Sequence, residues 1–192
     1  MKSQIQGHEV APGRPGAGAQ RARKEHRAFL SVDVVHHSEM NRAGTPLTTE
    51  YSFGQYQRWV NEVVQRWGGQ TTNSAGDGVM CLFPSDTQAL RAARQLQEEL
   101  SRFDAEHNRL PQAFRIRCGV SAGEVAVGGG EAIGQLQSAV IDRAAALQKR
   151  AEPGGILVGG EVAATALLEL GPVTPLDDPI GGEPAFEWIR KP

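Results

Sequence analysis

The stretch AFLSVDVV, residues 28–35, decides how the rest of this sequence is interpreted. Its apolar and β-branched side chains are typical of a strand that lies inside a sheet. Asp33 interrupts the run near its end, and a charged carboxylate at the end of a buried strand is costly unless it has a partner such as a metal ion. The stretch therefore predicts a buried strand that ends in a residue with a chemical role.

The chain after this strand alternates between helical and strand patterns. Apolar residues recur at helical spacing or in short runs of strand type, and glycine or proline ends several of the segments. Helices are predicted over 56–67, 90–103, 140–150 and 161–170, and strands over 70–83, 114–120, 124–127, 156–158 and 185–189. Turns are expected at 74–78 and 121–123. This order predicts an α+β sandwich with helices on one face of a largely antiparallel sheet.

The composition indicates one folded domain. Of the 192 residues, 22% are charged and 40% are hydrophobic, which suits a single globular unit. Two cysteines, Cys81 and Cys118, are too few for a disulfide-rich scaffold. Because no secretory signal is evident, both thiols are expected to be reduced and buried, and a cytoplasmic location is expected. The apolar runs are too short for a membrane span.

The charges are unevenly spread along the chain. Residues 1–27 hold six basic and two acidic residues, and the remainder holds 14 basic and 20 acidic residues. Residues 1–27 are also poor in large apolar side chains, which predicts a disordered basic tail before a folded domain over 28–192. An acidic domain argues against a dedicated nucleic-acid binder, because such proteins usually carry a basic patch on the folded part.

Several common motifs are missing from the sequence. The chain has no GxxxxGK[ST] segment, which excludes a P-loop nucleotide site. Gly128, Gly129, Gly130 and Gly134 do not have the dinucleotide-binding spacing, because Ile133 stands where the third glycine would be. Neither His-Glu-x-x-His nor paired Cys-x-x-Cys is present, so a zinc site has little support.

Two aspartates remain as candidates for chemistry. Asp33 ends the first strand, and Asp77 lies in a Gly-Asp-Gly turn between the next two strands. If these strands are neighbours, both carboxylates emerge at one edge of the sheet, where a pair of them can hold one or two Mg²⁺ ions. Ordinary turn chemistry for Asp77 and a strand-end cap for Asp33 are the alternatives.

Four segments, in order, resemble the catalytic domain of class III nucleotide cyclases, the adenylyl and guanylyl cyclase family. They are FLSVDVVHHSEM, NSAGDGVMCLFP, FRIRCGVSAGEVAVG and DRAAALQKRAEPGGILV, and the resemblance covers residues 28–189. It implies a palm-like, ferredoxin-type α+β sandwich that works as a homodimer with the active site at the interface. It also implies a nucleoside triphosphate as substrate and a 3′,5′-cyclic nucleotide plus pyrophosphate as products, in signalling.

The resemblance assigns roles to individual residues. Asp33, the Val34 carbonyl and Asp77 match the positions that bind Mg²⁺ or Mn²⁺. His36, His37 and Ser38 occupy the segment that wraps the phosphates, where His36 replaces a glycine. Asn73 and Gln135 stand at the base-selecting positions, and because amides both donate and accept, the choice of base stays open.

The transition-state helix departs from the family pattern. Asp142 and Ala146 stand where the family has an asparagine and an arginine, and no lysine matches near the C-terminus. Such an arginine stabilises charge that develops on the phosphates, and the loss of a comparable group costs on the order of 10³-fold in rate. Two hypotheses follow: an active cyclase in which Asp142 contacts the ribose, or a catalytically degenerate domain that binds nucleotide or only dimerises.

Overall fold

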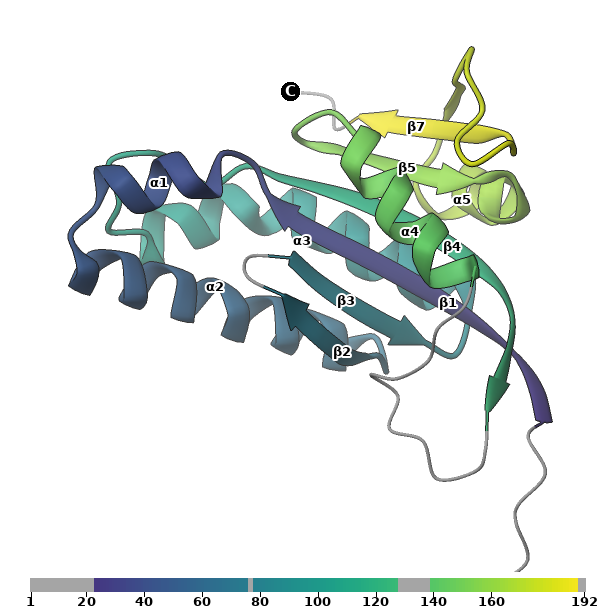
Figure 1. Cartoon of the computed structure of the whole chain (residues 1–192), viewed down its shortest axis with the longest axis horizontal. Helices are drawn as coiled ribbons and strands as arrows, with labels where there is room; N and C mark the ends of the chain where they lie inside the picture. Colours follow the sequence, from purple (N-terminus) through teal and green to yellow (C-terminus); the bar gives the residue numbers. More distant parts are fainter. Residues whose placement is uncertain (1–22, 76–77, 128–138, 190–192) are drawn as a thin grey trace, which may run out of the picture.

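The fold is built on one sheet whose strands are ordered β2-β3-β1-β4-β5-β7-β6 (Figure 1). The computed structural model describes residues 23–75, 78–127 and 139–189. The strands are β1 Arg23–Val34, β2 Gln70–Ala75, β3 Gly78–Phe83, β4 Ile116–Val127, β5 Gly155–Gly159, β6 Thr174–Pro175 and β7 Ala185–Ile189. The helices are α1 His37–Ala43, α2 Pro46–Arg66, α3 Asp86–His107, α4 Ala139–Arg150 and α5 Ala163–Glu169, with a 3₁₀ turn over Gly160–Val162.

The two long helices start at clear capping signals. Thr45 and Thr48 form a reciprocal capping box at the start of α2, with Pro46 at the first helical position. Ser85 accepts a hydrogen bond from the backbone of Gln88 at the start of α3. These caps lie in sequence well before the apolar periodicity becomes clear, so both helices begin earlier than predicted.

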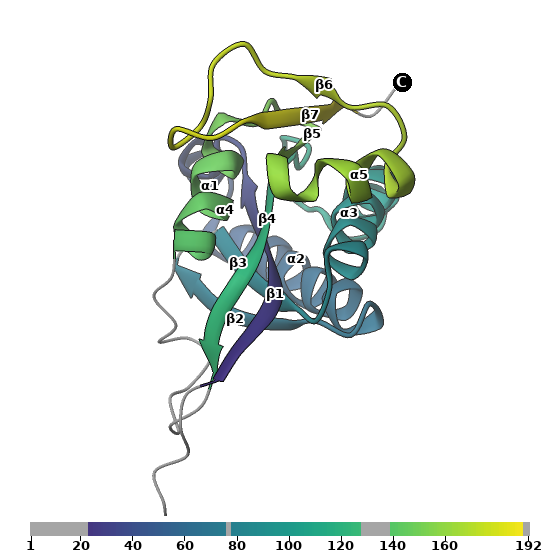
Figure 2. The same cartoon turned by 90° about the vertical axis from the view of Figure 1, so that its right-hand side faces the viewer.

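Strand β1 lies inside the sheet, between β3 and β4, and separates two apolar layers. Leu30 and Val32 belong to the large core shared with α2 and α3, whereas Phe29 belongs to a smaller cluster with Ala144 of α4. Figure 2 shows α4 on one side of β1 and β4, with α2 and α3 on the other side. The prediction of an α+β fold with a largely antiparallel sheet is confirmed, but α4 corrects the expectation that all helices share one face.

Helix α4 lies on the second face of the sheet because that face is also apolar. Phe29, Leu82 and Val125 present apolar side chains there, and these need cover. Gly119 of β4 allows α4 to approach closely, because a Cβ at that position would lie 2.3 Å from both the Ala144 carbonyl oxygen and the Gln148 nitrogen. Helix α4 therefore packs on the sheet with its backbone almost in contact.

The sheet is antiparallel except for the pair β4–β5. The buried Gln97 side chain of α3 donates hydrogen bonds to the carbonyls of Ile116 and Gly155, at the point where these two strands begin. It thereby satisfies two acceptors at the start of the β4–β5 pairing, which consists of only three residue pairs. The turn predicted at 121–123 is absent, because β4 runs unbroken along β1 as far as Val127.

Strand β1 also begins earlier than expected. Residues Arg23 to Arg27 pair with β4, so they belong to the sheet rather than to the tail predicted over 1–27, and residues 1–22 lie outside the described structure.

Cys81 and Cys118 are free and buried, as predicted, and burial raises the pKa of Cys118 to about 12. Within the described ranges, no helix combines the length and apolarity that a membrane crossing requires.

Candidate functional site

Asp33 lies at the end of the central strand, on the sheet face covered by α4. It is directly opposite Arg117 of β4 in the antiparallel register, and its side chain is 18% exposed. Arg117 donates to Asp33 Oδ2 from Nε at 3.0 Å and from Nη2 at 2.8 Å. Gln148 of α4 donates to the same oxygen from Nε2 at 3.1 Å. The carboxylate is thus held in one orientation by groups from β4 and α4.

Arg117 contacts only one of the two carboxylate oxygens of Asp33, which leaves the other oxygen, Oδ1, for a different contact. An arginine often binds a carboxylate with one donor on each oxygen, but here both described Arg117 donors converge on Oδ2. Oδ1 is therefore the atom through which Asp33 would reach a cation. Carboxylate ligands of metals are commonly oriented in this way by hydrogen bonds to the oxygen that does not coordinate.

The start of β3 lies beside the end of β1. Strand β3 pairs with β1 so that Val79 is opposite Val32, and Gly78 is the first residue of β3. The two strands are therefore neighbours, which is the condition on which the prediction of a shared carboxylate edge depended. Asp77 itself lies outside the described residues, so its carboxylate is not placed.

The Val34 carbonyl points toward the β3 side of β1. The Val35 N–H donates to the Arg115 carbonyl across β4 at 2.8 Å. Because the N–H and C=O groups of a trans peptide point in opposite directions, the Val34 carbonyl faces away from β4 and toward the β3 side. The Val34 carbonyl, Asp33 and Gly78 at the start of β3 thus lie at one corner of the sheet.

His36 has the left-handed backbone conformation that glycine adopts most readily. Its φ is 61° and ψ is 27°, and it is the one non-glycine residue with positive φ in the described ranges. The chain can therefore follow the path that a glycine would allow, at a cost of about 1 kcal/mol or more. The His36 side chain is exposed and lies 3.3 Å from Glu39.

His37 and Ser38 are placed differently from one another. The His37 ring packs edge-on against Phe53 of α2 with a centroid distance of 4.5 Å, and it lies 3.1 Å from the Asn41 side chain. It therefore helps to join α1 to α2. Ser38 is exposed in the first turn of α1 and is accessible to a ligand.

The base-selecting candidates are described only in part. The Asn73 backbone pairs with Met80 just after an irregularity in β2, and its side chain is outside the described set, as is the whole of Gln135. Asp142 is exposed in the first turn of α4. The structure therefore leaves both base-selecting assignments as predictions.

The positively charged Arg143 of α4 makes contacts that stabilise the fold. Ala146 is half-buried against the small cluster that includes Leu147 and Ile180. The neighbouring cation Arg143 is 12% exposed, pairs with Glu161 and Glu183, and donates to the Pro184 carbonyl at 2.9 Å. Arg143 is therefore tied to the loop before β7 and does not replace the missing arginine at 146.

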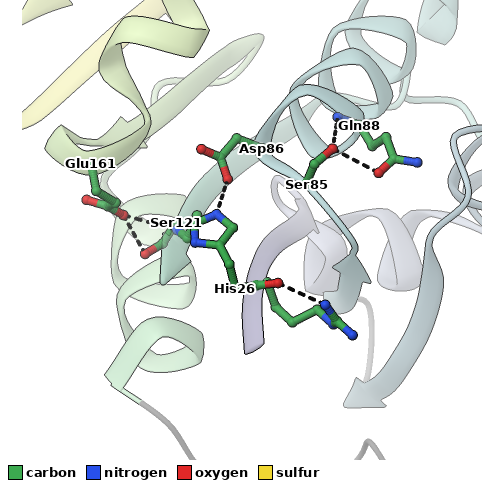
Figure 3. A network of polar contacts seen from close by, with 8 residues as sticks. His26, Ser85, Asp86, Gln88, Ser121 and Glu161 are labelled. Atoms are coloured by element: carbon green, nitrogen blue, oxygen red, sulfur yellow. Dashed lines mark hydrogen bonds and ion pairs between the residues drawn. The ribbon is translucent and has the colours of Figure 1, made fainter. Parts of the chain in front are cut away.

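A second polar network lies further toward the other end of β1 (Figure 3). His26 contacts Asp86 at the start of α3 at 2.7 Å, which anchors the beginning of β1 to that helix. Glu161 accepts hydrogen bonds from the Ser121 hydroxyl at 2.8 Å and the Ala122 N–H at 3.1 Å. These contacts connect structural elements and bring none of the predicted site residues together.

Arg117 and Gln148 are the site residues that sequence reasoning missed. Both are polar residues inside a strand and a helix, and nothing in the local pattern distinguishes them from solvent-facing positions. The one available signal was indirect: alternation along 28–34 and 116–120 places Asp33 and Arg117 on the same face if the strands pair in this register.

The residues at this corner suit a hard divalent cation in part. Asp33 Oδ1 and the Val34 carbonyl are oxygen donors of the type that Mg²⁺ and Mn²⁺ prefer. The described residues alone contain no group of three or more His, Cys, Asp or Glu side chains that could hold a metal ion. A complete site therefore needs the second carboxylate predicted at Asp77, together with oxygens from a ligand.

Known proteins resemble this chain in sequence and in fold. No family profile matches it. "Putative adenylate cyclase 3" of Rhizobium meliloti (strain 1021) is 25% identical over 138 residues, which are 71% of this chain and 22% of that protein. The matching segment thus spans about a fifth of the curated relative.

Solved structures extend the likeness to the whole fold. The dimeric guanylyl cyclase domain of the RhoGC fusion protein from the aquatic fungus Blastocladiella emersonii superposes with a TM-score of 0.74 at 14% identity, covering 88% of this chain and 96% of that one. The guanylate cyclase domain of RhGC from Catenaria anguillulae, in complex with GTP, gives 0.72 at 16% identity, with 88% and 100% covered. The chain therefore has the fold of class III adenylyl and guanylyl cyclase catalytic domains, as its four motifs indicated.

Proposed function

We propose that this chain is a nucleotide cyclase domain. It binds a nucleoside triphosphate with Mg²⁺ or Mn²⁺ at the corner formed by Asp33, Val34 and Asp77, and it works as a homodimer. The observation that carries the proposal is the orientation of Asp33: one carboxylate oxygen is held by Arg117 and Gln148, and the residue ends β1 beside the start of β3. The likeness to cyclase domains supports the same assignment.

In the proposed reaction the ribose 3′ oxygen attacks the α-phosphorus in line. A bond forms between these atoms as the bond to pyrophosphate breaks, and the 3′ hydroxyl proton passes to solvent. A bound divalent ion would make the 3′ hydroxyl more acidic and neutralise phosphate charge. Asp33 and the Val34 carbonyl hold that ion, His36 and Ser38 line the path of the phosphates, and Asp142 of the second subunit accepts a hydrogen bond from the ribose.

The test is direct product detection. The full chain is incubated with Mn²⁺ and with each of ATP, GTP, CTP and UTP, at a concentration where sedimentation shows a dimer. Mass spectrometry is expected to find a 3′,5′-cyclic monophosphate and pyrophosphate from at least one of them. Asp33→Asn should abolish the product, whereas Glu62→Gln, which changes an exposed carboxylate of α2 on the opposite face of the sheet, should not. Absence of product from all four nucleotides would overturn cyclisation.

A second candidate is a nucleotide-binding or dimerisation module without turnover. The observation that favours it is the packing of Ala146 together with the ion pairs that occupy Arg143. This candidate predicts binding of a Mn²⁺–triphosphate complex that depends on Asp33 and Asp77, with no cyclic product. Binding that survives both Asp33→Ala and Asp77→Ala would contradict the metal corner in either case.

A further inference from the structure

The outer face of α2 holds a glycine that the packing of a single chain does not require. Gly54 lies near the middle of this 21-residue helix, and a Cβ at that position would meet no atom within 4 Å. Glycine inside a helix is destabilising relative to alanine, and in the described structure no close approach or left-handed backbone at Gly54 compensates for this. A contact with another molecule explains the missing side chain better than the fold does.

Gly54 lies in an open hollow on this face of α2. The hollow has a volume of about 460 Å³ and is lined by Leu47, Glu50, Tyr51, Gly54 and Arg58. Its apolar side chains are open to solvent, because Leu47 is 78% exposed and Tyr51 is 39% exposed. Positions 47, 51, 54 and 58 follow the alternating spacing of four and three residues by which one helix packs against another. In Figure 1, α2 lies along one side of the molecule, and none of the described elements lies beyond it.

The Tyr51 ring in this hollow is held in place by the loop after α3. The Arg109 guanidinium lies over the ring, 5.7 Å from its centroid. Arg109 is itself fixed, because Nη1 donates to the Asn108 carbonyl at 2.9 Å and Nη2 donates to the Glu106 carbonyl at 3.1 Å. An aromatic side chain that is ordered before a partner arrives loses less entropy when the contact forms.

We propose that this face of α2 binds the same face of a second copy of the chain, with the two helices antiparallel and crossing at Gly54. The charges on the face select this partner, because Glu50 lies four residues before Gly54 and Arg58 lies four residues after it. In a two-fold antiparallel pair centred on Gly54, each residue faces the one at the same distance on the other side, so Glu50 of each copy faces Arg58 of the other. Among the described residues, neither side chain has an ion-pair partner in its own chain.

This contact is separate from the homodimer proposed for cyclisation. Helices α2 and α4 cover opposite faces of the sheet, so a second copy on α2 leaves the side of α4 and Asp33 free. Two different two-fold interfaces on one chain together produce assemblies larger than a dimer. One pair of helices buries less than the roughly 1,200 Å² that is typical of stable complexes, so we expect a weak association that depends on concentration.

The experiment measures the association of the full chain by sedimentation velocity over a series of concentrations. Glu50→Arg and Arg58→Glu each place like charges opposite one another at both contacts, so each variant should associate about tenfold more weakly or less than that. An equimolar mixture of the two variants should associate like the wild type, because opposite charges then face each other at both contacts again. Glu62→Arg makes the same change of charge two turns beyond Gly54 on the same helix, and as the matched control it should associate like the wild type.

Gly54→Gln separates association from folding. It fills the hollow with a residue of higher helix propensity, so it should raise the melting temperature while it weakens the association. Charge variants that associate like the wild type, or a mixture that does not recover, would overturn the two-fold contact. A wild type whose mass does not change with concentration would overturn it as well, and would leave the face to a different protein. Cyclic nucleotide formation should be the same in Glu50→Arg as in the wild type, so a failure of the proposed activity is detected independently.

Discussion

The two sides of the proposed site differ in how they are built. At the sheet corner, Asp33, the Val34 carbonyl and the start of β3 are brought together by strand register, and hydrogen bonds from two other elements fix the Asp33 side chain. On α4 the backbone is held just as firmly by Gly119, but the side chains at 142 and 146 lack the groups that the cyclase pattern places there. The backbone is therefore well held on both sides, while of these two sides only α4 lacks side chains that the cyclase pattern requires.

This difference separates two requirements of a catalytic site. Register and close packing decide where a side chain can be, and a single substitution at a correctly placed position decides whether the chemistry is present. At Ala146 the first requirement is met, because its backbone belongs to a well-packed helix. Only the second requirement fails, because the side chain carries no charge. We therefore expect side-chain substitutions on α4 to change the activity strongly without any change of the fold.

The largest expected effect comes from restoring the cyclase pattern on α4. The double variant Asp142→Asn, Ala146→Arg supplies the missing transition-state cation and removes a negative charge near the phosphates. We expect the initial rate of cyclic nucleotide formation to rise by up to about 10³-fold, measured by mass spectrometry with Mn²⁺. The double variant Asp142→Asn, Ala145→Arg, which places the same charge about 100° around the helix, is the matched control. Equal rates in the two variants would show that position 146 does not face the substrate.

The next largest effect tests the packing that both sides share. Gly119→Ala would place a methyl carbon 2.3 Å from the backbone of Ala144 and of Gln148, which forces α4 away from the sheet. The free energy of unfolding should fall by about 3 kcal/mol or more, as measured by urea denaturation. In the control Gly54→Ala, where no atom lies within 4 Å, stability should rise by up to about 1 kcal/mol. Similar values for both variants would mean that α4 is not held by this contact.

A smaller effect is expected where the cation of α4 is tied to the fold. Arg143→Met removes the partner of Glu161 and Glu183 while keeping most of the apolar stem. Stability should fall by about 1–3 kcal/mol, because the part-buried Glu161 loses its counter-ion. The exposed Arg58 provides a control, since Arg58→Met should change the unfolding free energy by less than about 0.5 kcal/mol. A loss of cyclisation without a loss of stability would instead assign Arg143 to the chemistry.

The smallest effect concerns the corner itself. His36→Gly keeps the left-handed backbone and removes the side chain that makes it unfavourable, so the protein should gain about 0.5–1 kcal/mol in thermal denaturation. His37→Gly should do the reverse, because it removes the contact with Phe53 and places glycine in a helix. A loss of stability in His36→Gly would mean that the His36 imidazole contributes more than its backbone costs.

The sequence was sufficient for the elements that carry a strong apolar pattern. Strands β1, β3 and β7 and the three longer helices α2, α3 and α4 follow from period and from glycine or proline stops. The pairing of β1 with β3 is confirmed, whereas the carboxylate edge predicted from it stays a prediction. The whole of α1, strand β6 and the start of β1 over Arg23–Arg27 were missed, since their residues give no such pattern.

The contacts around Asp33 required three-dimensional information. Asp33 and Arg117 are 84 residues apart, and Gln148 is 115 residues from Asp33. A one-residue change in the β1–β4 register would move Arg117 to the opposite face and break the pair. No local rule reports such a register, and the placement of α4 on the second face likewise depended on Gly119, whose role is visible only with the helix in place.

The position of β1 inside the sheet has a consequence for how the protein is made. The strand is synthesised before both of its neighbours, β3 and β4, and its longest pairing, with β4, awaits residues some 80 to 100 positions later in the chain. Until β4 is made, the apolar run that includes Leu30 and Val32 has the β2–β3 hairpin as its nearest partner in sequence. We expect this order to give a late closing step in folding, with the apolar run left partly exposed in nascent chains that end before residue 127.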